Sequence, residues 1–300
     1  MNLLFLGGTG FLGSHCARAL AKKHNIIILD IRDNYPDLYA KYYKTALSDV
    51  QKIKEIIDSE KIDIVFHCVS TLLPSSSFED YQNDLMVNYL PSIKLFSYCA
   101  DSGIKLVYIS SGGAVYGTHN EIFNENTKRE PISYYGLSKL NFENIIHFLH
   151  QNKKLDYMIL RPSNPYGPGQ NINGKQGVIA VLIGKILDFA PFEIWGDGTA
   201  IKDYIYIDDF SDYVEKLIEI ESWNCDFNIG SGIGNSVNDV INCFKENKIS
   251  LPEIIFLNSK TSDVKRMILD CSKIQELFPE KKCLTLSEGI KKFFKYESEK

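Results

Sequence analysis

The chain has 300 residues with 44% hydrophobic content, enough for one large α/β unit or for a nucleotide-binding domain with a smaller lobe. Its net charge of -5 gives no general attraction to nucleic acid or to an anionic membrane, and no segment approaches the roughly 18 apolar residues of a membrane span. Its seven cysteines are scattered without CxxC or metal-ligand spacing, so we expect no disulfide framework, no metal site and a cytoplasmic location. The apolar N-terminus lacks a basic region and a cleavage site and is interrupted by glycines, so we expect no signal peptide.

The first fourteen residues have the pattern of a strand that turns into a helix around a phosphate. The apolar run Leu3–Leu6 suits a buried parallel strand, and Phe11–Lys23 is amphipathic. Between them lies the glycine spacing of a dinucleotide-binding turn: Gly7, Gly10 and Gly13. The first-turn N–H groups, including those of Phe11 and Leu12, are then available to phosphate oxygens. A glycine-rich turn without a ligand is the alternative reading.

The second predicted strand, Asn25–Leu29, ends at an acid. Asp30 follows Gly13 by 17 residues, near the spacing at which a carboxylate binds the ribose hydroxyls of NAD. A carboxylate there repels the extra phosphate of NADP, so NAD is the predicted cofactor. Arg32 complicates this preference, although a solvated surface arginine is the simpler interpretation.

The following segments alternate between strands and helices. We predict a strand at 43–47, a helix at 50–59, a strand at 62–66, a helix at 78–102 that carries Asn88 and bends at Pro91, and a strand at 104–109. Asp49 either contacts an adenine amino group or caps the helix after it. His67 is interpreted as structural. Such alternation predicts a doubly wound parallel sheet whose ligands lie at the carboxyl ends of its strands.

The chemistry is predicted in the next segments. SSGGAVYG, Ser110–Gly117, combines two hydroxyls with glycines that let the backbone pass close to a ligand. Tyr135 and Lys139 are four residues apart on a predicted helix that begins near Ser133, which places phenol and ammonium on one face. We expect the ammonium to lower the pKa of Tyr135 toward neutrality, so that the phenol can exchange a proton. A chance pair on a helix surface is the alternative.

In this combination of motifs the chain resembles the extended short-chain dehydrogenases/reductases, within their NAD-dependent sugar epimerase/dehydratase group. The resemblance extends over nearly the whole length and includes three later motifs: RPSNPYGPGQ (161–170), GDGTAIKDYIYIDD (196–209) and SDVKRMILDCSK (262–273). It implies that Tyr135 is the general acid/base, that Lys139 binds the nicotinamide ribose and tunes Tyr135, and that Asn164 contacts the substrate. It also implies that Asn88 lies at the cofactor and that the chain forms a homodimer.

The sequence departs from the family pattern at several sites. Gly112 stands where many epimerases carry a catalytic hydroxyl, so we expect Ser111 to supply it, with Ser110 as the alternative. Ala114 replaces the glutamate of the dehydratases and decarboxylases. The arginines that clamp a pyrophosphate are replaced by two lysines, Lys202 and Lys260, with solvated surface lysines as the alternative. Met267 matches a position beside the sugar, where a flexible thioether predicts some tolerance of N-acetyl groups; core packing is its alternative.

These observations predict a Rossmann-type NAD-binding domain over 1–163 and a smaller substrate lobe over 164–300, with strands near 204–207 and 227–229 returning to the first sheet. The implied activity is epimerisation of a nucleotide-diphosphate sugar at carbon four through a 4-keto intermediate. A nucleotide-4-ketosugar reductase would use the same residues but would need external reduced cofactor. A catalytically silent NAD-sensing scaffold is the third reading, and the intact pair Tyr135 and Lys139 argues against it.

Overall fold

The computed structural model describes residues 1–33, 39–118, 122–174, 176–258 and 266–300, and it forms two compact units. Unit 1 comprises Met1–Gly117, Lys128–Arg161 and Ser211–Phe227, and unit 2 comprises Thr118–Thr127, Pro162–Phe210 and Asn228–Lys300. The division after Arg161 lies close to the predicted boundary after residue 163, but Thr118–Thr127 also belongs to unit 2, and Ser211–Phe227 returns to unit 1. The chain crosses between the units several times, and most of one late helix belongs to unit 1.

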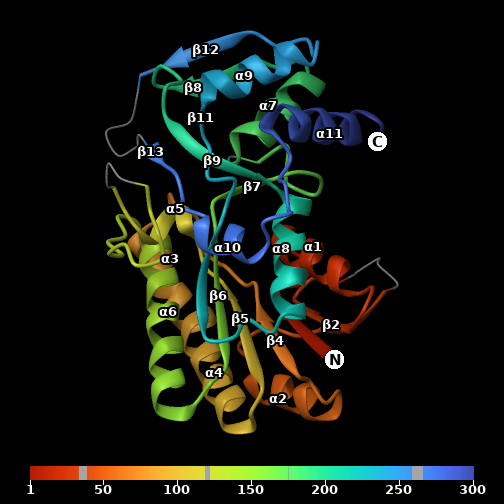
Figure 1. Ribbon diagram of the computed structural model, residues 1–300, viewed down its shortest axis with the longest axis vertical. Coiled ribbons are helices and arrows are strands. Elements are labelled where there is room, and N and C mark those ends of the chain that lie inside the picture. Colours follow the sequence, from red (N-terminus) through yellow and green to blue (C-terminus); the bar gives the residue numbers. More distant parts are fainter. Residues whose placement is uncertain (34–38, 119–121, 175, 259–265) are drawn as a thin grey trace. The chain divides into compact units, whose positions relative to one another are not determined.

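Unit 1 is built on a seven-stranded sheet in the order β10-β6-β5-β4-β1-β2-β3 (Figure 1). Its strands are β1 (Asn2–Leu6), β2 (Asn25–Asp30), β3 (Ala40–Lys44), β4 (Ile64–His67), β5 (Lys105–Ile109), β6 (Tyr157–Pro162) and β10 (Cys225–Ile229). Strands β1 to β6 run parallel. The strand order reverses beside β1, which makes the carboxyl ends of β1 and β4 the point where ligands of such sheets bind. The predicted doubly wound fold is confirmed.

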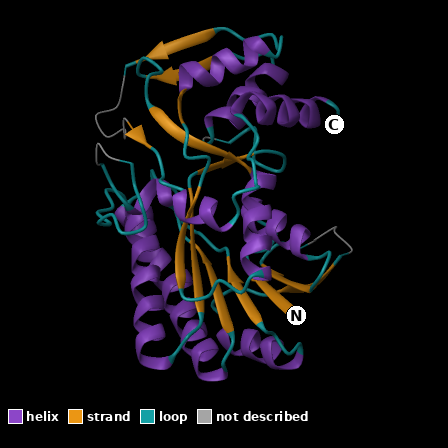
Figure 2. Cartoon of the chain, viewed as in Figure 1, coloured by secondary structure: helices purple, strands orange, loops and turns teal. Residues whose placement is uncertain are grey.

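Helices cover both faces of this sheet (Figure 2). They are α1 (Phe11–Leu20), α2 (Val50–Ser59), α3 (Phe78–Asp84), the π-helix η1 (Leu85–Tyr89), α4 (Leu90–Ser102), α5 (Gly112–Val115), α6 (Tyr134–Lys153) and α8 (Ile207–Glu219). Successive strand residues point to opposite faces. Leu4 and Leu6 accordingly share one hydrophobic cluster with α2, α4 and α6, while the opposite face carries α1 and α8. Lys23, three residues after the end of α1, forms an ion pair with Glu219 of α8.

Two local predictions for unit 1 need correction. The strand expected at 43–47 is β3 at Ala40–Lys44, so the loop between β3 and α2, which contains Asp49, is longer than predicted. The single helix expected at 78–102 is divided, because η1 separates α3 from α4, and Pro91 lies in the first turn of α4. Proline has no N–H to donate, and the widened π-turn before it accommodates the altered hydrogen-bond register.

Unit 2 contains two small sheets. One joins β9 (Ile201–Tyr206) to β7 (Asn164–Tyr166), β11 (Gly234–Ser236) and β13 (Arg266–Met267), and the other pairs β8 (Phe192–Trp195) with β12 (Ile254–Leu257). The helices are α7 (Val178–Leu187), α9 (Val237–Glu246), α10 (Ser272–Leu277) and α11 (Leu286–Ser298). The strand expected near 227–229 lies in the seven-stranded sheet as part of β10. The one expected near 204–207 does not, because β9 pairs with its neighbours in unit 2.

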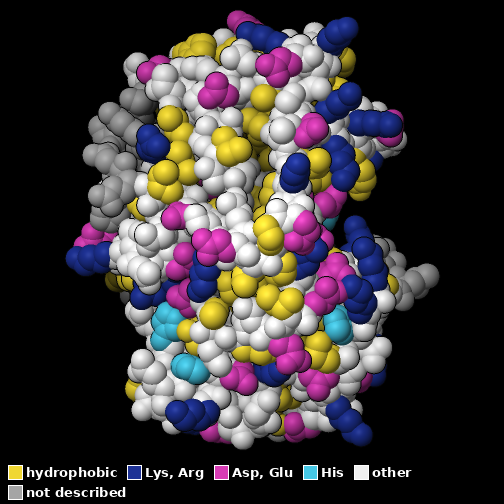
Figure 3. All heavy atoms as spheres, in the orientation of Figure 1, with side chains coloured by type: hydrophobic (Ala, Val, Ile, Leu, Met, Phe, Trp, Pro, Cys, Tyr) yellow, Lys and Arg dark blue, Asp and Glu magenta, His cyan; other side chains and the backbone are white. Residues whose placement is uncertain are grey.

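The surface carries charge of both signs. On the face in Figure 3, basic and acidic side chains are interspersed among hydrophobic and uncharged ones, as the small net charge leads one to expect. Among the described residues, none of the helices is long and apolar enough to cross a bilayer.

Candidate active site

The turn after β1 is shaped for close approach of a phosphate. Gly7 adopts a φ of +72°, and a Cβ at Gly13 would lie 2.9 Å from the Gly7 carbonyl oxygen, so a larger residue at either position would disturb the turn. Helix α1 begins after Gly10, whose lack of a side chain leaves the first-turn N–H groups of Phe11 and Leu12 without a side-chain cap. These groups and the positive end of the helix dipole suit an anion.

Asp30 ends β2 beside this turn. Its Oδ2 accepts hydrogen bonds from the Thr9 hydroxyl at 2.6 Å and from the Thr9 backbone N–H at 3.2 Å, and its Oδ1 accepts from the Ile31 N–H. Arg32 is exposed and donates to the Thr9 carbonyl oxygen. The carboxylate is therefore fixed at the rim of the glycine turn, and its contact with a ribose stays a prediction.

Two other predicted cofactor residues have structural partners. Asp49 accepts a hydrogen bond from the Lys52 N–H and caps α2, which is one of its two predicted roles; an adenine contact stays a prediction. Asn88 is buried in η1, where its amide donates to Asp84 Oδ1 at 2.9 Å and accepts from Ser92. His67 is buried and bonded to Ser92, as its structural interpretation requires.

The predicted acid/base residues come together at the start of α6. Ser133 caps this helix by accepting from the Gly136 N–H, and Tyr135 and Lys139 lie in its first two turns. Lys139 is buried; its Nζ donates to the Ile109 carbonyl oxygen at 2.8 Å and lies 5.8 Å from the centre of the Tyr135 ring. The end of β5 therefore fixes the ammonium beside the phenol.

The serines after β5 point to different partners, as strand alternation predicts. Ser111 forms a hydrogen bond with Tyr135, which lowers the pKa of the phenol, whereas Ser110 is buried and donates to Glu143. Ser111 is thus the serine that reaches the phenol.

The predicted direction of the Tyr135 pKa is wrong for the protein without ligands. Desolvation raises the pKa of Tyr135 and outweighs the hydrogen bond from Ser111. Desolvation also lowers the pKa of Lys139 to about 8, although Asp84 and Glu143 favour its charged form. The spacing of the two side chains can be read from the sequence, whereas the burial of Lys139 and the partial burial of Tyr135 cannot.

Unit 2 has a cavity of about 250 Å³. It is lined by Asn164, Pro165, Tyr166, Gln170, Gly177, Val178, Ile179, Ala200, Lys202, Tyr204 and Val237. The predicted residues Asn164 and Lys202 therefore share one cavity, with Asn164 held by its donation to the Asp203 carbonyl oxygen at 2.8 Å. Met267 on β13 is buried and lies opposite Lys202 on the neighbouring strand β9. It is not among the described residues that line the cavity. Lys260 lies outside the described residues.

Comparison with known proteins identifies the family. The model of the NAD dependent epimerase/dehydratase family matches residues 3–230, more than two thirds of the chain. The chain belongs to this family. A dTDP-4-dehydro-6-deoxyglucose reductase of Escherichia coli is 32% identical over 98% of this chain and 96% of its own length.

Two epimerases are similar over the same extent. A putative UDP-glucose 4-epimerase of Methanocaldococcus jannaschii is 32% identical, over 97% of this chain and 96% of its own length. The crystal structure of UDP-glucose 4-epimerase with UDP-glucose from Thermotoga maritima superposes with a TM-score of 0.91 at 30% identity, over 100% of this chain and 99% of that one.

Some residues of unit 1 were missed by sequence reasoning. Glu143 and Arg161 are fully buried and bonded to each other near the end of β5. Glu143 follows Lys139 by four residues, a spacing that could have placed it on the same helix face. Arg161 was noted only as the first residue of a motif.

Proposed function

We propose that the protein is an NAD-dependent epimerase that inverts carbon four of a nucleotide-diphosphate sugar through a transient 4-keto intermediate. The observation that carries this proposal is the group formed by Ser111, Tyr135 and Lys139, in which a phenol is bonded to a hydroxyl and faces an ammonium. Membership of the epimerase/dehydratase family supports it. The net reaction is redox-neutral, so no external reductant is consumed.

NAD fits the residues around the β1 turn. Its pyrophosphate would lie on the N–H groups of Phe11, Leu12 and Gly13, and its adenosine ribose on Asp30. Lys139 would hold the nicotinamide ribose, with Asn88 and Asp49 as further contacts. NAD, when bound there, would supply a reversible hydride acceptor for carbon four.

The proton chemistry belongs to the side chains. Tyr135 removes the proton of the 4-hydroxyl and returns one to the 4-oxygen, and Ser111 donates a hydrogen bond to that oxygen. Lys139 stabilises the phenolate when it is charged. Desolvation raises the pKa of Tyr135 and lowers that of Lys139 to about 8, so the phenol holds its proton more firmly than the ammonium does.

The cavity of unit 2 is proposed to hold the nucleotide end of the substrate. Apolar and aromatic walls suit a base, while the Asn164 amide and the Lys202 ammonium suit polar and phosphate oxygens. Lys260 is proposed as the second phosphate contact. Met267, next to Lys202 in the sheet, is proposed to limit room beside the sugar.

The similarity to a 4-keto sugar reductase is consistent with a second candidate function, reduction of a nucleotide-4-ketosugar. Both functions use the same three residues and differ in whether reduced cofactor is consumed. The test is to purify the protein, identify its bound nicotinamide and assay a panel of UDP and dTDP sugars without added cofactor. Epimerisation under these conditions supports the first function, and turnover that requires added reduced nicotinamide supports the second.

We also propose that the protein works as a cytoplasmic homodimer. Several large apolar side chains are exposed on α3, η1, α4 and α6 of unit 1: Phe78, Met86, Val87, Leu90 and Phe148. A second copy could cover such a face. All seven cysteines are free thiols, which suits a reducing compartment. Light scattering on the purified protein would measure the subunit number.

A further inference from the structure

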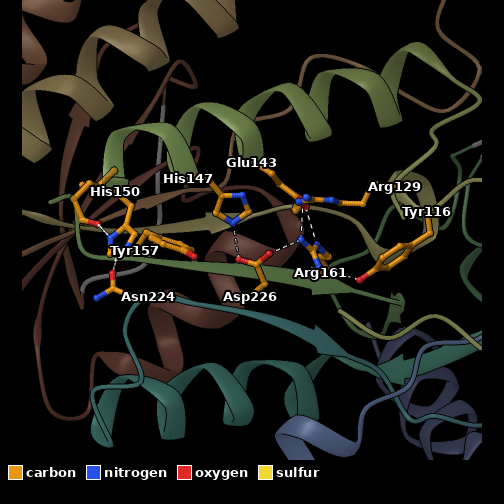
Figure 4. A network of polar contacts seen from close by, with 11 residues as sticks. Tyr116, Arg129, Glu143, His147, His150, Tyr157, Arg161, Asn224 and Asp226 are labelled. Carbon is orange, nitrogen blue, oxygen red and sulfur yellow. Dashed lines mark hydrogen bonds and ion pairs between the residues drawn. The ribbon is translucent and has the colours of Figure 1, made fainter. Parts of the chain in front are cut away.

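The cluster of polar residues in Figure 4 joins elements that carry the proposed catalytic residues. Arg161, at the end of β6, donates from Nε and Nη2 to the two carboxylate oxygens of Glu143 on α6, both at 2.9 Å. Arg129 donates to the same carboxylate at 2.9 Å, and Asp226 accepts from Arg161 at 2.5 Å while bonding His147 on its other oxygen. The two guanidinium groups balance the two carboxylates, which makes such a buried cluster tolerable.

The ion pair between Arg161 and Glu143 holds both ends of the loop that contains Ser111. Ser110, immediately before it, donates to Glu143 Oε1. Tyr116, which follows α5, accepts from Arg161 Nη1 at 3.0 Å. The two residues that bracket Ser111 and α5 are therefore bonded to opposite members of one fully buried pair.

The same ion pair also holds the helix that contains Tyr135. Glu143 follows Tyr135 by eight residues and Lys139 by four, so the three side chains lie along one face of α6. The Glu143 carboxylate thus holds the loop of Ser111 through its hydrogen bond with Ser110. Glu143 itself belongs to α6, the helix that carries Tyr135. A change at this carboxylate would alter the distance between the two hydroxyls.

We propose that Glu143, with Arg161 as its counter-ion, is a positioning residue of the reaction that sets the hydrogen bond between Ser111 and Tyr135. The inference rests on the proposed roles of those two residues. If the ion pair were purely structural, weakening its hydrogen bonds would lower the stability of unit 1 and leave the proton chemistry of Tyr135 unchanged. The positioning role predicts that weakening the attachment of the loop changes that chemistry.

The test uses two variants of the full-length holoenzyme that remove one hydroxyl each and no charge, Ser110→Ala and Tyr116→Phe. Tyr157→Phe is the matched control, because it removes a hydroxyl from a buried tyrosine whose ring packs against His147 and His150 near the start of β6. The measurements are kcat and KM against pH and the 13Cζ resonance of Tyr135, which responds to hydrogen bonding of the phenol.

For Ser110→Ala and Tyr116→Phe we expect kcat to fall about 10-fold, well short of the ~100-fold loss on deleting a catalytic donor. KM should stay within about twofold of the wild-type value, since the substrate contacts are intact. The acidic limb of the kcat profile should move to higher pH, because a weaker bond from Ser111 raises the pKa of Tyr135, and the Tyr135 resonance should shift. Tyr157→Phe should change none of these.

Unchanged profiles and an unchanged Tyr135 resonance in both variants would overturn the inference, and so would equal effects in Tyr157→Phe. Failure of the proposed function looks different: the wild-type protein would turn over no nucleotide sugar, while the Tyr135 resonance would still shift in Ser110→Ala. If one variant does not fold, the other decides, because each removes a separate bond to the ion pair.

Discussion

Gly136→Ala should damage activity far more than stability. A Cβ at Gly136 would lie 2.4 Å from the Ala114 carbonyl oxygen and 2.9 Å from Pro131 Cβ, whereas ordinary contacts begin near 3.4 Å. The first turn of α6 and the α5 loop must therefore separate by about 1 Å. Such overpacking costs about 1–3 kcal/mol, offset by about 1 kcal/mol of helix propensity gained over glycine. A misplacement of about 1 Å at reacting groups costs on the order of 100-fold in rate.

The assay compares kcat and the free energy of unfolding with those of Gly103→Ala. Gly103 has a φ of +69° and nothing within 4 Å of its Cβ position, so alanine there costs about 1–2 kcal/mol of backbone strain without touching the site. The two variants should have similar stabilities, and only Gly136→Ala should lose about 100-fold in kcat. Activity of Gly136→Ala within about threefold of wild type would refute the expectation that separating α6 from the α5 loop misplaces Ser111 and Tyr135.

Other expected outcomes follow from single contacts. Asp30→Ala should weaken NAD binding more than NADP binding in a titration, because the carboxylate binds ribose hydroxyls and repels the extra phosphate; equal losses would remove that role. In nucleotide-free protein, the lowered pKa of Lys139 means that the unfolded chain binds more protons between pH 8 and 10.5, so stability should rise with pH there by up to about 1.4 kcal/mol per unit relative to Lys139→Met. The same dependence of the free energy of unfolding on pH in both proteins would contradict this. Lys202→Glu should raise the substrate KM more than it alters NAD affinity, and an unchanged KM would make Lys202 a surface residue.

The sequence predicted the parts of the fold that depend on short segments. The glycine turn, Asp30 at the end of β2 and the pair Tyr135 and Lys139 each lie within one strand, turn or helix, where spacing determines geometry. For Asp49 the sequence allowed either an adenine contact or a helix cap, and the structure shows that it caps α2. Local patterns are informative because periodicity fixes which side chains share a face.

Features that depend on distant segments could not be predicted in the same way. The apolar pattern of Tyr204–Ile207 suits any buried strand, and only its partners β7, β11 and β13 assign it to unit 2. The attachment of Ser110 to Glu143 joins residues 33 apart, and that of Arg161 to Asp226 joins residues 65 apart. The direction of the Tyr135 pKa depended on burial, which spacing does not report.

The most direct test of the proposed chemistry follows the hydrogen at carbon four. The purified protein, with its own bound nicotinamide and no added cofactor, is incubated with UDP-glucose that carries deuterium at that carbon, and NMR follows the nucleotide sugar. We expect UDP-galactose to form with the deuterium still at carbon four, and Tyr135→Phe to nearly abolish its formation. Exchange of the deuterium with solvent, or conversion only when reduced nicotinamide is added, would contradict it.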